Sequence, residues 1–267
     1  MNNSINIPLI DAHIHLDTYN PQQPLHLELL PSEGITGVIA VSMNLASSKT
    51  NLALSQLYPE LVHPAFGYHP EQPLPTEEET QQLFSWMELH IQDMVAIGEV
   101  GLPYYSQLEA EENDLSFDQT PYINLLEKFI SFAASHNKPI VLHAVYQDAN
   151  IVCNLLEQYH VTRAHFHWFK GSPDTIERMA RNGYYISFTP DLLYEAEIQE
   201  LARIYPTHQI MVETDGPWPF EGPFTGQMTH PRMISDVVEE WSRIHHMSVE
   251  AARELIYGNT QRFYGIK

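Results

Sequence analysis

Five short segments of the chain place a metal-binding residue type at the end of an apolar stretch. They are Asp11-Ala12-His13-Ile14-His15, Gly98-Glu99-Val100-Gly101, Val141-Leu142-His143, His165-Phe166-His167 and Glu213-Thr214-Asp215-Gly216. Imidazole and carboxylate ligands together suit divalent ions of the zinc, manganese or iron kind. Two such ions about 3.5–4 Å apart can hold a hydroxide and polarise a substrate. The pattern therefore predicts a metal centre that performs hydrolysis.

The spacing within the first segment supports this interpretation. Residues two apart on a strand point to the same face, so His13 and His15 can both contact one ion. Asp11 lies on that face too, and we expect its carboxylate to accept a hydrogen bond from a ligand imidazole and to fix its tautomer. Taken alone, the His-x-His spacing is equally consistent with two ordinary core or surface histidines.

The two acidic candidates suggest different roles. Glu99 has two oxygens and can bridge two ions, although Gly98-Glu99 could also merely end a strand. Asp215 can bind a metal and accept the proton of the attacking water. A surface aspartate in a Thr-Asp-Gly turn would not explain why Asp215 follows the apolar run Ile210-Met211-Val212.

The elements that must position these residues are strands alternating with helices. Apolar, β-rich runs occur at residues 9–15, 37–43, 63–68, 94–100, 139–143, 163–167, 184–188 and 209–213. Helical spacing is clearest at residues 119–135, 174–181, 195–205 and 248–257. Eight such units predict an α/β fold, the (β/α)8 TIM barrel, whose chemistry lies at the carboxyl ends of the strands. Such a barrel typically needs about 250 residues, so we expect a single domain over residues 1–267.

Charge and cysteine usage narrow the function classes. Lys and Arg total 13 against 34 Asp and Glu, a formal net charge of −21. This balance counts against sequence-independent nucleic-acid binding, which rests on Lys and Arg neutralising phosphates, although bound cations would change the local sign. Cys153 is the only cysteine and lies in a helical pattern, so we expect a buried structural thiol. Without a secretory signal or an apolar stretch of membrane-spanning length, we expect a soluble cytoplasmic protein with no membrane contact and no obligate protein partner.

Together these segments resemble the TatD-like metal-dependent hydrolases, the TatD deoxyribonuclease family, whose barrel is of the amidohydrolase type. The likeness covers nearly the whole chain. It rests on Asp11-Ala12-His13-Ile14-His15 (family D-x-H-x-H), Gly67-Tyr68-His69-Pro70 (G-x-H-P), Gly98-Glu99-Val100-Gly101-Leu102 (G-E-I-G-L), Pro139-Ile140-Val141-Leu142-His143 (P-V-x-x-H), His167-Trp168-Phe169-Lys170-Gly171 (H-C-F-S-G), Glu213-Thr214-Asp215 (E-T-D) and the closing segment Asn259-Thr260-Gln261-Arg262-Phe263-Tyr264.

The resemblance implies hydrolysis of a phosphoester, by default in DNA, with two divalent ions (zinc, manganese, magnesium or iron). It implies that His13 and His15 bind one ion, that Glu99 bridges, that His143 and His167 bind the second, that Asp215 contacts the first ion and is the general base, and that His69 lies near the substrate. The motif favours His167 over His165, two residues earlier on the same strand face, which we expect deeper in the barrel. For His69, a turn histidine held by Pro70 is an equal alternative.

Departures from the family pattern leave the substrate open. Basic residues that would hold a substrate phosphate are replaced in the segment Pro103-Tyr104-Tyr105-Ser106, at Val145 and in residues 216–224. A small ester, lactone or amide is therefore the alternative substrate. A non-catalytic binding barrel is a third hypothesis, but it predicts a lost ligand and all six are present.

The aromatic loop that contains Trp218, Phe220 and Phe224 has two interpretations. It either covers the site and selects an apolar or planar substrate group, or packs as a plug against the barrel rim.

Overall fold

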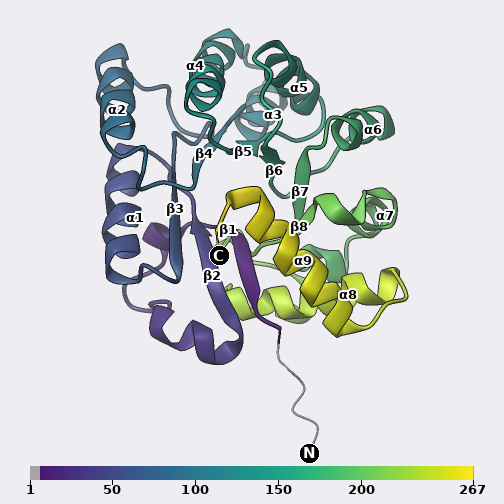
Figure 1. The fold of residues 1–267 in the computed structure, drawn as a ribbon. Coiled ribbons are helices and arrows are strands. Elements are labelled where there is room, and N and C mark those ends of the chain that lie inside the picture. Colours follow the sequence, from purple (N-terminus) through teal and green to yellow (C-terminus); the bar gives the residue numbers. More distant parts are fainter. Residues whose placement is uncertain (1–6, 267) are drawn as a thin grey trace, which may run out of the picture.

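Eight parallel strands form a barrel in the computed structural model, which describes residues 7–266 (Figure 1). The residues before position 7, in which we expect no signal, lie outside the described part. The strands are β1 (Leu9–Ile14), β2 (Ile35–Ala40), β3 (Val62–Phe66), β4 (Ala96–Gly101), β5 (Ile140–His143), β6 (Ala164–Phe166), β7 (Tyr185–Phe188) and β8 (Ile210–Val212). Each strand pairs with the next along the chain. The residues after β8 return to β1, where the His15 N–H donates to the Gly216 carbonyl at 2.8 Å and the Asp215 N–H to the His13 carbonyl at 2.9 Å. The predicted TIM barrel is confirmed.

Helices follow the strands and surround the barrel (Figure 1). They are α1 (Leu45–Leu57), α2 (Glu77–Leu89), α3 (Tyr104–Glu112), α4 (Thr120–His136), α5 (Asp148–Gln158), α6 (Pro173–Arg181), α7 (Ala196–Ile204), α8 (Ile234–Ile244) and α9 (Val249–Tyr264). Short 3-10 segments lie at Leu16–Thr18, Leu27–Glu33, Pro190–Leu193, Thr207–Gln209, Gly222–Phe224 and Pro231–Met233. The predicted helices at 119–135, 174–181 and 195–205 match α4, α6 and α7 closely. The fourth prediction ended too early, because α9 continues to Tyr264 and is capped by Gly265, whose φ is 69°.

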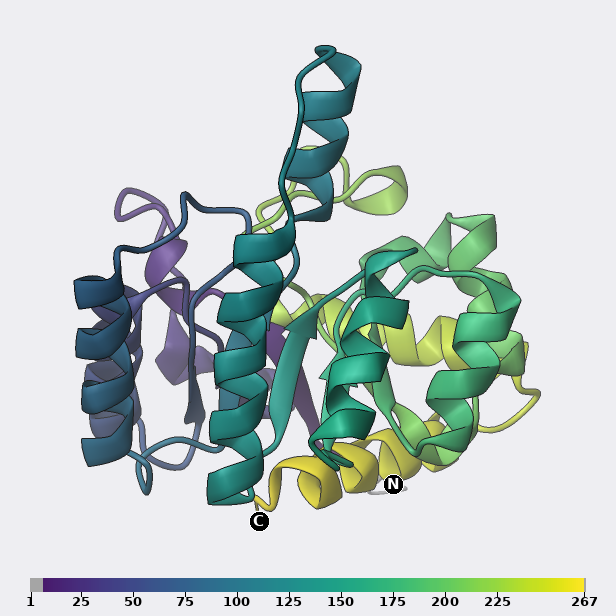
Figure 2. The same ribbon diagram turned by 90° about the horizontal axis from the view of Figure 1, so that it is seen from above.

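Two apolar layers hold the barrel together. The larger layer lies between the strands and the helices, whereas a smaller cluster fills the barrel interior with side chains such as Ile39 and Met211. The end of α9 closes one mouth of the barrel, because Phe263 and Tyr264 join that interior cluster. The Tyr264 hydroxyl also donates to the Ala12 carbonyl at 3.1 Å. Figure 2 shows α9 lying across this end of the molecule.

The opposite mouth, at the carboxyl ends of the strands, is more open. Helix α3 projects above the barrel there, and part of the chain after β8 rises beside it (Figure 2). None of the helices in the described residues is long and apolar enough to cross a membrane.

The structure supports a structural role for Cys153, which is fully buried in α5. Burial raises the pKa of this thiol to about 12. Only the thiolate reacts with alkylating reagents, so we expect no labelling of the folded protein at pH 8 and rapid labelling in denaturant. Mass spectrometry after iodoacetamide treatment measures this, and full labelling of the folded chain would contradict it.

Candidate metal centre

Glu99 occupies the centre of the open mouth, on β4, and is fully buried. Two glycines bring its strand close to β5. A Cβ atom added to Gly98 would meet the Cβ of Val141 at 2.6 Å, and one added to Gly101 would overlap the carbonyl oxygen of His143. The glycines therefore permit the close approach that brings Glu99 next to His143.

One oxygen of Glu99 faces the histidines at the end of β1. Its Oε2 atom lies 3.1 Å from Nε2 of His13 and 3.2 Å from Nε2 of His15. Oδ1 of Asp215, three residues after β8, lies 3.3 and 3.4 Å from the same two nitrogens. Strand ends that are far apart in sequence thus bring four candidate ligands together.

The other oxygen of Glu99 faces a second group of histidines. Its Oε1 atom lies 2.7 Å from Nε2 of His167, 2.9 Å from Nδ1 of His143 and 3.4 Å from Nε2 of His69. The His143 and His167 nitrogens are 3.4 Å apart. His69 therefore lies against the same carboxylate as the other candidates.

These side chains fit divalent ions. Buried polar atoms without a hydrogen-bond partner include Nε2 of His13, Oε2 of Glu99 and Oδ1 of Asp215, all of which point into the cluster. Three overlapping groups have ligand atoms within 4.8 Å of one another: His13, His167 and Asp215; His13, His15 and Glu99; and His69, Glu99 and His143. Buried polar atoms are normally paired, so a cluster left without partners is what a metal site requires.

Attraction between the imidazoles and the carboxylates of the cluster sets their protonation states. Burial raises the pKa of Glu99, but the positive fields of His167, His69 and His13 outweigh it and hold the pKa well below its usual value. Burial lowers the pKa of His15, but contacts with Asp215 and Glu99 raise it to about 10. Metal ions must displace these protons from the imidazoles, because only neutral histidine binds metal.

Asp215 has a left-handed backbone with φ of 48°, a conformation that aspartate tolerates better than most residues. The hydrogen bond from its N–H to the His13 carbonyl holds it there. Burial raises its pKa, but the close contacts with His13 and His15 outweigh this and lower it, so the carboxylate is ionised at neutral pH.

The prediction for Asp11 is wrong. Its carboxylate accepts hydrogen bonds from the backbone N–H groups of His13 and Thr214, at 3.3 and 3.0 Å, and from the Thr214 hydroxyl. No imidazole of the described residues donates a hydrogen bond to this carboxylate. Barrel closure places the end of β8 beside β1, so the N–H and hydroxyl of Thr214 occupy its acceptor sites. Asp11 therefore joins two strands and does not orient a ligand ring.

The structure places His165, on β6, and His167, directly after β6, in different surroundings. His165 is fully buried below the mouth and is hydrogen-bonded to Ser187 and Tyr264 at 2.5 and 2.8 Å. Burial and the positive fields of His13 and His167 hold its pKa well below the usual value, so it is neutral. The expected deeper position of His165 is thereby observed.

Two carboxylates outside the cluster were missed by sequence reasoning. Oε1 of Glu213 lies 3.4 Å from Nδ1 of His167, and Oε1 of Glu71 lies 3.4 Å from Nε2 of His143. Burial raises the pKa of Glu71, but contacts with His143 and Ser106 outweigh this and lower it to about 2. Glu213 belongs to a recognised segment, whereas no spacing rule marks Glu71, a loop residue two positions after His69.

A cavity of about 690 Å³ opens above the cluster. Among the described residues that line it, acidic side chains include Glu71 and Glu109, and none is lysine or arginine. The apolar lining includes Tyr105, Trp168 and Trp218.

Packing against the barrel rim is seen for part of the aromatic loop, whereas selection of a substrate group stays a prediction. Phe220 and Phe224 are buried with Met233 and pack as a plug. Trp218 is 60% exposed and lines the cavity.

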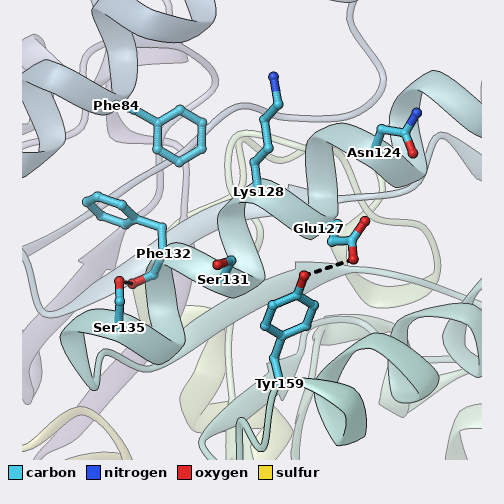
Figure 3. Close-up of a pocket in the computed structure, with 8 residues that line it drawn as sticks. All are labelled: Phe84, Asn124, Glu127, Lys128, Ser131, Phe132, Ser135 and Tyr159. Atoms are coloured by element: carbon cyan, nitrogen blue, oxygen red, sulfur yellow. Dashed lines mark hydrogen bonds between the residues drawn. The ribbon is translucent and has the colours of Figure 1, made fainter.

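A second hollow of about 700 Å³ lies on the outer face of the barrel, along α4 (Figure 3). It is lined by residues such as Phe84, Phe132 and Tyr159, whose hydroxyl donates to Glu127. None of the candidate metal ligands borders it, so the chemistry belongs to the barrel mouth.

The parallel barrel and its histidine–carboxylate mouth define a metal-dependent hydrolase class, and comparisons with known proteins identify the family. The family model for TatD related DNase matches residues 10–265. An uncharacterized metal-dependent hydrolase of Haemophilus influenzae is 38% identical over 256 residues, covering 96% of this chain and 99% of the relative. Deoxyribonuclease TATDN3 of Homo sapiens is 26% identical, covering 97% of this chain and 95% of the relative. The solved structure of the TatD homolog YJJV from Escherichia coli K12 superposes with a TM-score of 0.79 at 21% identity, covering 98% of this chain and 100% of that one.

The chain belongs to the TatD-related DNase family and is a metal-dependent hydrolase. The resemblance recognised in the sequence is thereby confirmed.

Replacing His165 and His167 in turn tests whether they have different roles. We expect His167→Asn to lower the bound metal measured by elemental analysis after dialysis, because a ligand to the cluster is lost. His165→Asn should keep the metal and lower the melting temperature, since buried hydrogen-bond partners left unpaired cost about 1–3 kcal/mol. Equal metal loss in both variants would contradict this assignment.

Proposed function

We propose that this protein hydrolyses phosphoester bonds, as a deoxyribonuclease does, with two divalent ions and an activated water. The single observation that carries the proposal is the division around Glu99, whose two oxygens face two different sets of histidines. A carboxylate placed in this way suits a ligand shared between two ions. The name of the human relative, a deoxyribonuclease, supports DNA as the default substrate.

The first ion would be held by His13, His15, Asp215 and Oε2 of Glu99. The second would be held by His143, His167 and Oε1 of Glu99, with His69 near it and available to the substrate. Imidazole nitrogens favour zinc, manganese or iron over magnesium, which prefers oxygen ligands. Bound ions would lower the pKa of a water and polarise the phosphoryl oxygens.

Asp215 is proposed as the general base. Its carboxylate lines the cavity, is ionised at neutral pH and lies on the side of the cluster formed by His13 and His15. A proton lost by the attacking water can therefore pass to an oxygen of Asp215. Glu99 stays deprotonated within the ring of imidazoles and holds the reacting centre in place.

The variant Asp215→Asn tests the mechanism. We expect metal-dependent cleavage of single-stranded DNA to fall by about 10²–10⁴-fold, the usual contribution of a positioned acid–base group. Asp114→Asn is a matched control, because Asp114 is exposed and also has a left-handed backbone, with φ of 56°. Activity should be unchanged in the control. Hydrolysis of every substrate by Asp215→Asn at the wild-type rate would refute the mechanism.

The cavity lining favours a second candidate substrate. Glu71 and Glu109 repel a polyanion, and the described lining residues offer no lysine or arginine for phosphates beyond the reacting one. The ring of Trp218 offers an apolar surface instead. These features favour a small ester, lactone or amide with a planar group over a long nucleic acid.

A comparison of substrates in the Trp218→Ala variant tests this candidate. We expect KM for an aryl ester or aryl phosphoester to rise roughly 2–10-fold, the usual range for an aromatic contact. KM for the matching alkyl compound should stay the same. Leu89→Ala, an exposed apolar change on α2, is the control. Equal effects on aryl and alkyl compounds would show that Trp218 does not select planar groups.

A further inference from the structure

Glu71 links the candidate metal centre to α3, which borders the cavity above that centre. It lies in the loop between β3 and α2, two residues after His69. Its side chain is 17% exposed and borders the cavity above the cluster. Its carboxylate contacts the start of α3 on one side and the candidate ligand His143 on the other.

In the first direction, the carboxylate of Glu71 caps α3. Oε1 accepts a hydrogen bond from the Tyr105 N–H at 2.8 Å, and Oε2 accepts one from the Ser106 N–H at 2.9 Å. The Ser106 hydroxyl also donates to Oε2. Helix α3 has no side-chain cap of its own, since Pro103 is its N-cap residue and its first turn has no acidic residue. Glu71 therefore satisfies backbone donors that the helix itself leaves free.

In the second direction, the carboxylate faces a candidate metal ligand. Nδ1 of His143 lies 2.9 Å from Oε1 of Glu99. Its Nε2 atom has no hydrogen-bond partner among the described residues and lies 3.4 Å from Oε1 of Glu71. Histidines that bind metals commonly direct the other ring nitrogen to a carboxylate, which fixes the tautomer and raises the basicity of the ligand.

The neighbouring ligand shows the same arrangement. His167 directs Nε2 to Glu99 at 2.7 Å and Nδ1 to Glu213 at 3.4 Å. The two histidines of the second ion site thus each lie between the central carboxylate and an outer one. The outer carboxylate beside His143, that of Glu71, also caps α3.

We propose that Glu71 is a positioning residue that orients His143 toward the second ion and couples that ion to the docking of α3. This inference rests on the proposed function, because it assumes an ion at His143. Coupling between two sites is reciprocal. An ion that fixes His143 therefore favours the position of Glu71 that caps α3, and a docked α3 strengthens ion binding. Since Tyr105 and Ser106 line the cavity, ion binding also shapes the substrate wall.

The variants Glu71→Gln and Glu71→Ala separate the two roles. Glutamine keeps an oxygen for the α3 N–H groups but loses the negative charge that faces His143. We expect Glu71→Gln to weaken binding of one zinc or manganese ion by about 10–100-fold, the usual effect of losing such a partner. Titration of the purified, metal-free protein against a competing chelator measures this affinity.

Glu109→Gln is the matched control. Glu109 borders the same cavity on α3, so the variant removes an equal charge from the mouth. Its carboxylate makes no described hydrogen bond or ion pair, and we expect less than about a threefold change in metal affinity, since exposed charges act weakly at a distance.

Hydrogen exchange of α3 tests the coupling. In the wild type, zinc or manganese should slow exchange of the α3 amides. Glu71→Ala should lose this protection, whereas Glu71→Gln should retain much of it at saturating metal. Unchanged metal affinity in Glu71→Gln, or equal weakening in Glu109→Gln, would overturn the inference.

Failure of the proposed function gives a different result. If the wild type cleaves no phosphoester but Glu71→Gln still weakens metal binding, the substrate assignment fails and the role of Glu71 stands. If the wild type cleaves phosphoesters and Glu71→Gln binds metal normally, only the inference about Glu71 fails.

Discussion

The fully buried carboxylate of Glu99 is the constraint on which the rest of the site depends. An ionised carboxylate removed from water costs several kcal/mol unless positive or hydrogen-bonding groups surround it. The barrel supplies five imidazoles around it, from the ends of β1, β5 and β6 and from the loop after β3. Bound divalent ions would satisfy the same negative charge, with the imidazoles as candidate ligands. A polar centre is thus stable within an otherwise apolar barrel.

The centre is held in place by contacts that extend to both ends of the molecule. From His167, the path runs through Glu213, which accepts a hydrogen bond from Ser187, and then through His165 to the hydroxyl of Tyr264 on α9. Helix α9, which closes one mouth of the barrel, is therefore connected through these contacts to the candidate metal centre at the other mouth. At the open mouth, Glu71 makes a corresponding connection to α3. The candidate ligands are thus held by contacts with packed elements on both sides, which is what a defined metal geometry would require.

The surroundings of the candidate centre are acidic and aromatic. The acidic composition extends to the cavity, where Glu71 and Glu109 lie beside the candidate metal centre and no described lining residue is lysine or arginine. Bound ions would make the floor of the cavity positive while its walls stay acidic and aromatic. On the proposed function, such a site would attract one anionic or polarised group to the floor of the cavity and repel further phosphates. The walls would then select the substrate, and the ions at the floor would supply the chemistry.

The sequence by itself determined the barrel, because strand and helix periodicities are local properties, and ligand types at strand ends must meet where parallel strands end together. It therefore brought His13, Glu99 and Asp215 into one predicted site. Only the tertiary structure decided which neighbour each polar group reaches. Thr214 donates hydrogen bonds to the carboxylate of Asp11 because barrel closure places β8 beside β1. Glu71 lies next to His143 because the loop after β3 folds over the mouth of the barrel. These pairings depend on distances between segments remote in sequence, which no local pattern encodes.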